Sequence, residues 1–121
     1  MPIRTVMVVD DSATDRHVLA EMLASGGYVV IAVASAEEAQ MRIRTERPDA
    51  ILMDIVMPGK NGFEATRELQ RNDATRDIPV IVCTSKSQPT DRIWALRQGA
   101  REVLVKPVQR ARLLETLARL G

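Results

Sequence analysis

A carboxylate ends a continuous apolar segment near the middle of the sequence. Residues 50–53 show no alternation of polar and apolar side chains, which is typical of a strand buried on both faces of a parallel sheet, and Asp54 follows directly. Turn residues come next, namely Pro58, Gly59, Asn61 and Gly62. Open α/β folds bind ligands at the carboxyl edge of the sheet, so Asp54 is predicted to be functional. The alternative, that Asp54 caps the next helix, is less favoured because Asn61 and Gly62 lie closer to that helix.

Polar side chains end other apolar segments in the same way: Asp10 and Asp11, Thr84, and Lys106. If these segments are parallel strands, their carboxyl ends meet at one edge and the side chains come together. Clustered carboxylates repel one another, and a hard divalent cation such as Mg²⁺ relieves that repulsion. Lys106 follows an apolar strand, where an ammonium needs an anionic partner. A carboxylate, Mg²⁺, a lysine and a hydroxyl can together stabilise phosphoryl oxygens while the carboxylate attacks phosphorus.

The elements that must position these residues alternate along the chain. Apolar segments predict five strands, over residues 6–9, 28–33, 50–54, 80–84 and 102–105. Capping patterns, Ser12 with Asp15 and Ser35 with Glu38, predict the starts of the first two helices. Thr90 is expected to cap the fourth helix. In chain order, the expected apolar positions of the five helices are Val18, Leu19, Met22 and Leu23; Ala36, Ala39 and Ile43; Phe63 and Leu69; Ile93 and Leu96; and Leu113, Leu114, Leu117 and Leu120. This alternation predicts a doubly wound, mainly parallel α/β sheet.

Length and charge bound the possible functions. A chain of 121 residues has the size of one domain. The net charge of +1 provides no field that would recruit nucleic acid or an acidic membrane, and no apolar segment approaches the ~20 residues that span a bilayer. The single cysteine, Cys83, lies in an apolar segment and is expected to be a small buried hydrophobe in a reduced protein. Without a recognisable leader, the protein is expected to be cytoplasmic.

The order and spacing of the polar residues resemble those of a known family. The matching groups are Asp10 with Asp11, Asp54 with Met57, Pro58 and Gly62, Thr84 with Ser85, and Lys106 with Pro107. Over essentially the whole chain, they resemble the receiver domain of two-component response regulators. The resemblance implies a flavodoxin-like (βα)5 fold with strand order 2-1-3-4-5. It also implies one receiver domain over residues 1–121 with no output domain, phosphorylated by a histidine kinase in the presence of Mg²⁺.

The same resemblance assigns roles to individual residues. Asp54 is the phosphoacceptor and binds the Mg²⁺ ion together with Asp11 and the backbone carbonyl of Val56, while Asp10 acts through water. Thr84 hydrogen-bonds the phosphoryl group, and Lys106 pairs with it. The peptide bond between Lys106 and Pro107 is expected to be cis. The side chains of Val56 and Lys86 are expected to flank the path of the water that hydrolyses the acyl phosphate.

A narrower resemblance concerns residues 54–63 and 94–100, which look similar to stand-alone regulators of the chemosensory systems that control type IV pilus twitching. An unknown downstream protein is then expected at the face formed by the fourth helix, fifth strand and fifth helix. Trp94 is expected to belong to this face, and the chain to be a monomer or weak dimer. Where family members usually carry Tyr or Phe, this sequence has Val103, so the aromatic ring that couples activation to that face is missing.

Other functions stay open to different degrees. A Mg²⁺-dependent phosphatase with an aspartyl-phosphate commonly has a second acid two residues after the nucleophile, and here that residue is Val56. We therefore expect no enzyme activity beyond promotion of the protein's own phosphorylation and dephosphorylation. A DNA-binding regulator needs an output domain or a basic recognition helix, and we expect neither in this protein. A phosphate sink for a shared kinase has the same sequence features as a signalling regulator.

Overall fold

Strands and helices alternate throughout the computed structural model, which describes residues 2–85 and 88–121. In chain order the elements are β1 (Thr5–Val9), α1 (Ala13–Ser25), β2 (Val29–Val33), α2 (Ala36–Ile43), β3 (Ala50–Asp54), α3 (Gly62–Arg71), β4 (Val80–Thr84), α4 (Pro89–Arg97), β5 (Glu102–Val105) and α5 (Arg110–Leu120). The strand boundaries predicted from the sequence agree with these to within one residue.

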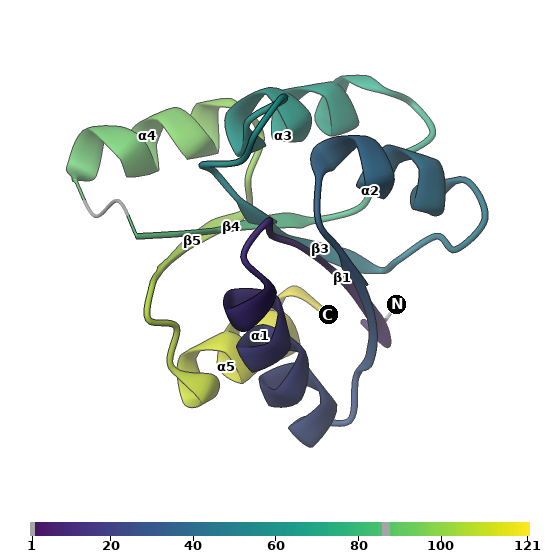
Figure 1. Cartoon of the computed structure of the whole chain (residues 1–121), viewed down its shortest axis with the longest axis vertical. Coiled ribbons are helices and arrows are strands. Elements are labelled where there is room, and N and C mark those ends of the chain that lie inside the picture. Colours follow the sequence, from purple (N-terminus) through teal and green to yellow (C-terminus); the bar gives the residue numbers. More distant parts are fainter. Residues whose placement is uncertain (1, 86–87) are drawn as a thin grey trace.

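All strand pairs are parallel, and the sheet has the order β2-β1-β3-β4-β5. Helices α1 and α5 cover one face of this sheet, and α2, α3 and α4 cover the other (Figure 1). The chain is therefore the doubly wound, flavodoxin-like (βα)5 fold expected from the sequence. Because every strand runs in the same direction, the residues that follow β1, β3, β4 and β5 lie along one edge.

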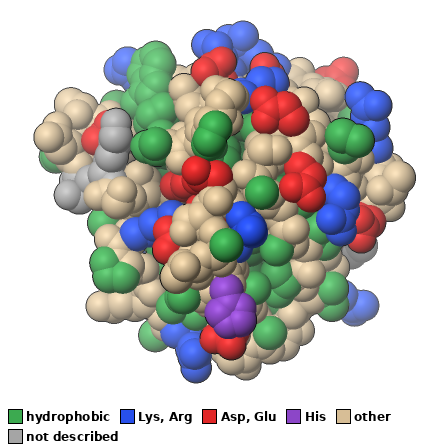
Figure 2. Space-filling model, in the orientation of Figure 1, with side chains coloured by type: hydrophobic (Ala, Val, Ile, Leu, Met, Phe, Trp, Pro, Cys, Tyr) green, Lys and Arg blue, Asp and Glu red, His purple; other side chains and the backbone are tan. Residues whose placement is uncertain are grey.

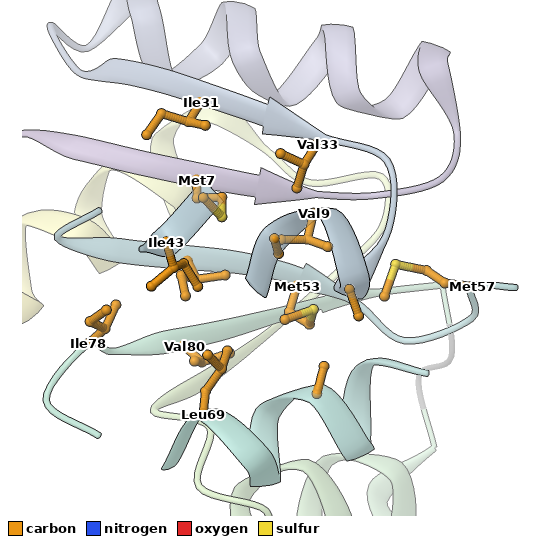
Figure 3. Close-up of a cluster of buried hydrophobic side chains, with 14 residues drawn as sticks. Met7, Val9, Ile31, Val33, Ile43, Met53, Met57, Leu69, Ile78 and Val80 are labelled. Atoms are coloured by element: carbon orange, nitrogen blue, oxygen red, sulfur yellow. The ribbon is translucent and has the colours of Figure 1, made fainter. Parts of the chain in front are cut away.

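Separate apolar clusters hold the helices to the two faces. Between the sheet and α2 and α3, strand side chains such as Met7, Met53 and Val80 meet Ile43 and Leu69 (Figure 3). On the opposite face, the cluster contains leucines of α1 and α5, namely Leu19, Leu23, Leu113 and Leu117. Every residue of β3 and β4 is buried. At about 1.5–3 kcal/mol for each large aliphatic side chain removed from water, this burial fixes the positions of the strands that end in the polar edge.

Side-chain caps fix the helix starts close to that edge. The Ser12 hydroxyl accepts a hydrogen bond from the Asp15 amide at 3.2 Å, and the Ser35 hydroxyl accepts one from the Glu38 amide at 3.1 Å, as the sequence patterns predict. Asn61 caps α3 by accepting a hydrogen bond from the Glu64 amide at 3.0 Å. Since Asn61 performs this role, the Asp54 carboxylate is not needed as a helix cap.

Helix α4 differs from the sequence prediction. It begins at Pro89, whose missing amide hydrogen costs nothing in the first turn, so Gln88 rather than Thr90 is the N-cap residue. The buried residue is Ala95, whereas Ile93 and Leu96, expected in the core, are 52% and 40% exposed. The helix therefore presents a different side to the sheet than the largest apolar residues suggest. In α1, Val18 is likewise 42% exposed rather than part of the buried stripe.

We predict that Gly62→Ala destabilises the protein strongly because an added Cβ would lie 2.0 Å from the Asp54 carbonyl oxygen. The backbones of β3 and α3 would have to separate, at a cost of about 2 kcal/mol or more in the free energy of unfolding. Chemical denaturation measures the loss. Gly27→Ala is the control, because Gly27 has φ +89° and no atom within 4 Å of an added Cβ, so only a conformational cost of about 1 kcal/mol applies. Equal losses in the two variants would contradict the steric explanation.

Candidate functional site

The polar residues singled out in the sequence meet at the carboxyl edge of the sheet. Asp10 directly follows β1, Asp54 and Thr84 are the last residues of β3 and β4, and Lys106 directly follows β5. The Lys106 ammonium lies 2.7 Å from Asp10 Oδ2 and 3.4 Å from Asp54 Oδ1. Side chains nearly one hundred residues apart in the sequence are thus in direct contact.

Asp10, Asp11 and Asp54 form a compact group in which one carboxylate oxygen from each residue lies within 4.8 Å of those from the other two. Asp10 is 1% exposed and Asp54 is 9% exposed, whereas Asp11 is open to solvent. Burial and the charge of Asp10 raise the pKa of Asp54 to about 6. An arrangement of oxygen ligands with excess negative charge fits a hard divalent cation, which would lower the repulsion between the carboxylates.

Lys106 supplies positive charge to this group. Its side chain is 16% exposed, and its ammonium donates hydrogen bonds to Asp10, Asp15 and Asp54. Burial alone would lower the pKa of Lys106, but the hydrogen bonds with Asp10 and Asp15 and the charge of Asp54 raise it well above its ordinary value. Lys106 is therefore charged at neutral pH.

Asp15 belongs to the site, although the sequence suggested only a capping role for it. Its amide donates to Ser12, but its carboxylate lies 3.0 Å from the Lys106 ammonium. The first turn of α1 therefore adds a fourth acid to the edge. The signal in the sequence is an acid in the first helical turn directly after the Asp10-Asp11 strand end, which must lie near any group bound there.

Thr84 and Val56 lie beside this cluster on different elements. Thr84 is 1% exposed, and its carbonyl accepts a hydrogen bond of 2.8 Å from the Lys106 amide, which ties β4 to the segment after β5. The peptide bond between Lys106 and Pro107 is cis, as expected. Val56 lies in the loop after β3 with its side chain 61% exposed. Lys86, expected to flank the path of water, and Ser87 lie outside the described residues.

Other residues considered from the sequence take structural or surface positions. Cys83 is fully buried next to Asp54 in the sheet, and burial raises the pKa of its thiol to about 12, so it is an unreactive hydrophobe. The single histidine, His17, is exposed and lies 3.2 Å from Glu21. Acidic and basic side chains intermingle over the face of the protein shown in Figure 2. Trp94 is 48% exposed and meets Phe63 edge to face. Within residues 2–85 and 88–121, no helix is long and apolar enough to cross a membrane.

Comparison with known proteins gives matches over nearly the whole chain. A family model described as the response regulator receiver domain matches residues 6–118. The chain is similar to Protein PilH of Pseudomonas aeruginosa, with 46% identity over 112 residues, or 93% of each chain. It is also similar to Chemotaxis protein CheY of Thermotoga maritima, with 35% identity over 119 residues and 98% of each chain. Among solved structures, the chain is similar to the receiver domain of sensor histidine kinase PA1611 from Pseudomonas aeruginosa PAO1, with a TM-score of 0.88 and 35% sequence identity. The match covers 97% of this chain and 96% of that chain, and that structure has a magnesium ion coordinated in its active site cleft.

The raised pKa of Asp54 predicts how stability depends on pH in metal-free buffer. Between about pH 4 and 6, Asp54 binds more protons in the folded protein than in the unfolded chain. The contribution of Asp54 to the free energy of unfolding therefore falls as the pH rises through this range. Above pH 6 the ionised carboxylate destabilises the fold by about 1–3 kcal/mol. Asp54→Asn should therefore be more stable than the wild type near neutral pH, and this difference should shrink toward pH 4. Chemical denaturation in EDTA at a series of pH values measures it.

Asp49→Asn provides the control for this pH series. Hydrogen bonds from the Thr5 and Arg4 amides hold the pKa of Asp49 below its ordinary value, so its contribution is constant above about pH 4.5 and is lost only at lower pH. The difference between Asp49→Asn and the wild type should not change between pH 5 and 7.5. A pH-independent effect of Asp54→Asn would contradict the assignment of the raised pKa.

Proposed function

Since the chain belongs to the response regulator receiver domain family, we propose that Asp54 is the residue that a histidine kinase phosphorylates. One observation carries this assignment: the Asp54 carboxylate ends a fully buried central strand with a charged lysine 3.4 Å away and two further carboxylates beside it. The Asp54 side chain is not required to cap the following helix, because Asn61 caps it.

In the proposed reaction, an Asp54 carboxylate oxygen attacks the phosphorus of a phosphohistidine. The phosphorus–nitrogen bond breaks, its electron pair stays with the imidazole, and an acyl phosphate forms on Asp54. The Lys106 ammonium stands close enough to neutralise charge on the transferring oxygens, and the Thr84 hydroxyl donates to one of them. With its pKa near 6, Asp54 is mainly ionised at neutral pH and can act as the nucleophile.

The acidic group is proposed to hold Mg²⁺. Asp11, Asp54 and the backbone carbonyl of Val56 would bind the ion directly, and Asp10 would bind it through water. When bound, the ion would neutralise phosphoryl charge and reduce the repulsion among the carboxylates. The clustered oxygens support this assignment, as does the magnesium ion in the active site cleft of the similar PA1611 receiver domain.

The output is proposed to be binding of a downstream protein at the face of α4, β5 and α5. Large apolar side chains are exposed there, namely Ile93, Trp94, Leu96 and Val105. Val103 is buried behind them with 6% exposure, in place of the aromatic residue usual in the family. Glu102 in β5 joins the two helices through ion pairs with Arg92 of α4 and Arg119 of α5. This chain is proposed to act as a monomer or weak dimer, and a downstream protein that contacts this face would respond to movements of α4.

We place this regulator in a chemosensory system controlling type IV pilus twitching. The resemblance of residues 54–63 and 94–100 to such stand-alone regulators supports this pathway, and the similarity to Protein PilH extends over 93% of both chains. The buried free thiol of Cys83 fits the reducing cytoplasm, where the phosphodonor kinase works. Receiver domains are generally signalling modules rather than enzymes, and Val56 offers no acid for phosphatase chemistry.

We predict that Asp54→Ala abolishes labelling by a kinase or a small phosphodonor, because no other carboxylate at the edge has the same place at the end of β3. In the wild type the label should be stable to acid and labile to base, as an acyl phosphate is. Asp73→Ala is the control, because Asp73 is an exposed acid that pairs with Arg76 and does not belong to the acidic group of Asp10, Asp11 and Asp54. This variant should be labelled like the wild type. Full labelling of the Asp54→Ala protein would refute the phosphoacceptor assignment.

We also predict that Asp11→Ala lowers Mg²⁺ affinity by about tenfold or more, because it removes a direct ligand. Calorimetric titration with MgCl₂ measures the affinity in the wild type, in Asp11→Ala and in the Asp73→Ala control. The proposed ligand set is wrong if Asp11→Ala binds Mg²⁺ as tightly as the control.

A further inference from the structure

We propose that Asp15 is a positioning residue that tethers Lys106 in the unphosphorylated protein, so that a phosphoryl group on Asp54 must displace this ion pair. The inference rests on the proposed roles of Asp54 and Lys106. It assigns to the first turn of α1 a direct influence on how readily the site accepts a phosphoryl group.

The hydrogen-bonding capacity of Lys106 is fully used in the structure. An ammonium has three N–H donors, and the Lys106 ammonium contacts three carboxylate oxygens, at 2.7 Å on Asp10, 3.0 Å on Asp15 and 3.4 Å on Asp54. A phosphoryl oxygen that pairs with Lys106 must therefore replace one of these acceptors.

Burial determines which acceptor is replaced. The Asp10 side chain is 1% exposed, and leaving a buried carboxylate without its cation is costly. Asp54 carries the phosphoryl group, and its carbonyl oxygen stays beside the ammonium after phosphorylation, so the contact of Asp54 with Lys106 is kept. The Asp15 side chain is 45% exposed, and water can solvate its carboxylate once the lysine leaves. Asp15 is thus the partner that Lys106 gives up at least cost.

The Asp15 carboxylate has no competing structural duty in the described part of the chain. The N-cap of α1 needs only the Asp15 amide, which donates to Ser12. Its carboxylate instead holds Lys106 and adds negative charge near the point where an anionic phosphodonor must approach. Both effects oppose phosphorylation, so removing the charge should favour it.

Asp15→Asn tests the tether while it preserves side-chain size and the backbone cap. We expect its affinity for beryllofluoride in MgCl₂, measured by fluorine NMR titration, to rise about twofold to fivefold, which is the range for a partly exposed ion pair. The rate of phosphorylation by acetyl phosphate should rise by a similar factor. Asp15→Glu, which keeps the charge within reach of Lys106, should return both values toward those of the wild type.

Glu37→Gln is the matched control. Glu37 is also an acid in the first turn of a helix, α2, and its carboxylate lies beside Gly59 in the loop after Asp54, but it makes no described contact with Lys106. The variant loses the same charge near the same edge and should leave beryllofluoride affinity nearly unchanged.

Unchanged or weaker binding in Asp15→Asn overturns the proposal, and so does an equal gain in Glu37→Gln, which would reveal only a general effect of charge. Labelling of Asp54→Ala provides the separate test of the proposed function. If Asp54 is the labelled residue and Asp15→Asn behaves as the wild type, only the tether is wrong.

Discussion

The ammonium of Lys106 lies among carboxylates that repel one another at one edge of the sheet. It contacts acids delivered by β1, α1 and β3, and its own position depends on β5 and on the hydrogen bond from its amide to Thr84. The arrangement requires that these elements keep their register, because a shift of one residue would move each polar side chain to the opposite face of its strand. Every residue of β3 and β4 is buried, and close packing of side chains of different sizes opposes such a shift.

The clustered charges at this edge lower the stability of the fold, and the apolar clusters on the two faces of the sheet offset that loss. Asp54 is nearly buried beside Asp10, and both burial and the neighbouring charge raise its pKa, so they disfavour the ionised carboxylate when no cation is bound. A site that binds a cation or a phosphoryl group needs such excess charge before the ligand arrives. Stability and function therefore oppose each other at Asp54, while the leucines of α1 and α5 and the residues of Figure 3 offset the difference.

Much of the fold and of the edge could be predicted from the sequence, because in a doubly wound sheet the strand ends meet wherever the strands are parallel. Continuous apolar runs placed Asp10, Asp54, Thr84 and Lys106 at those ends, and Ser12, Ser35 and Asn61 marked helix starts. The direction of a helical side chain depends instead on how the helix is rotated on the sheet, which local spacing does not specify. For that reason the contact of Asp15 with Lys106 was missed, and Ala95 rather than Ile93 proved to be buried in α4.

The close approach of Gly62 to the Asp54 carbonyl has an optical consequence. Gly62 is followed by Phe63, whose ring meets the edge of Trp94 with centroids 6.5 Å apart. Because no space separates Gly62 from the end of β3, we expect a displacement of that strand end to move Phe63 and alter the surroundings of the indole. Trp94 is the single tryptophan of the chain, so its fluorescence is an intrinsic reporter of events at the edge, free of background from other indoles.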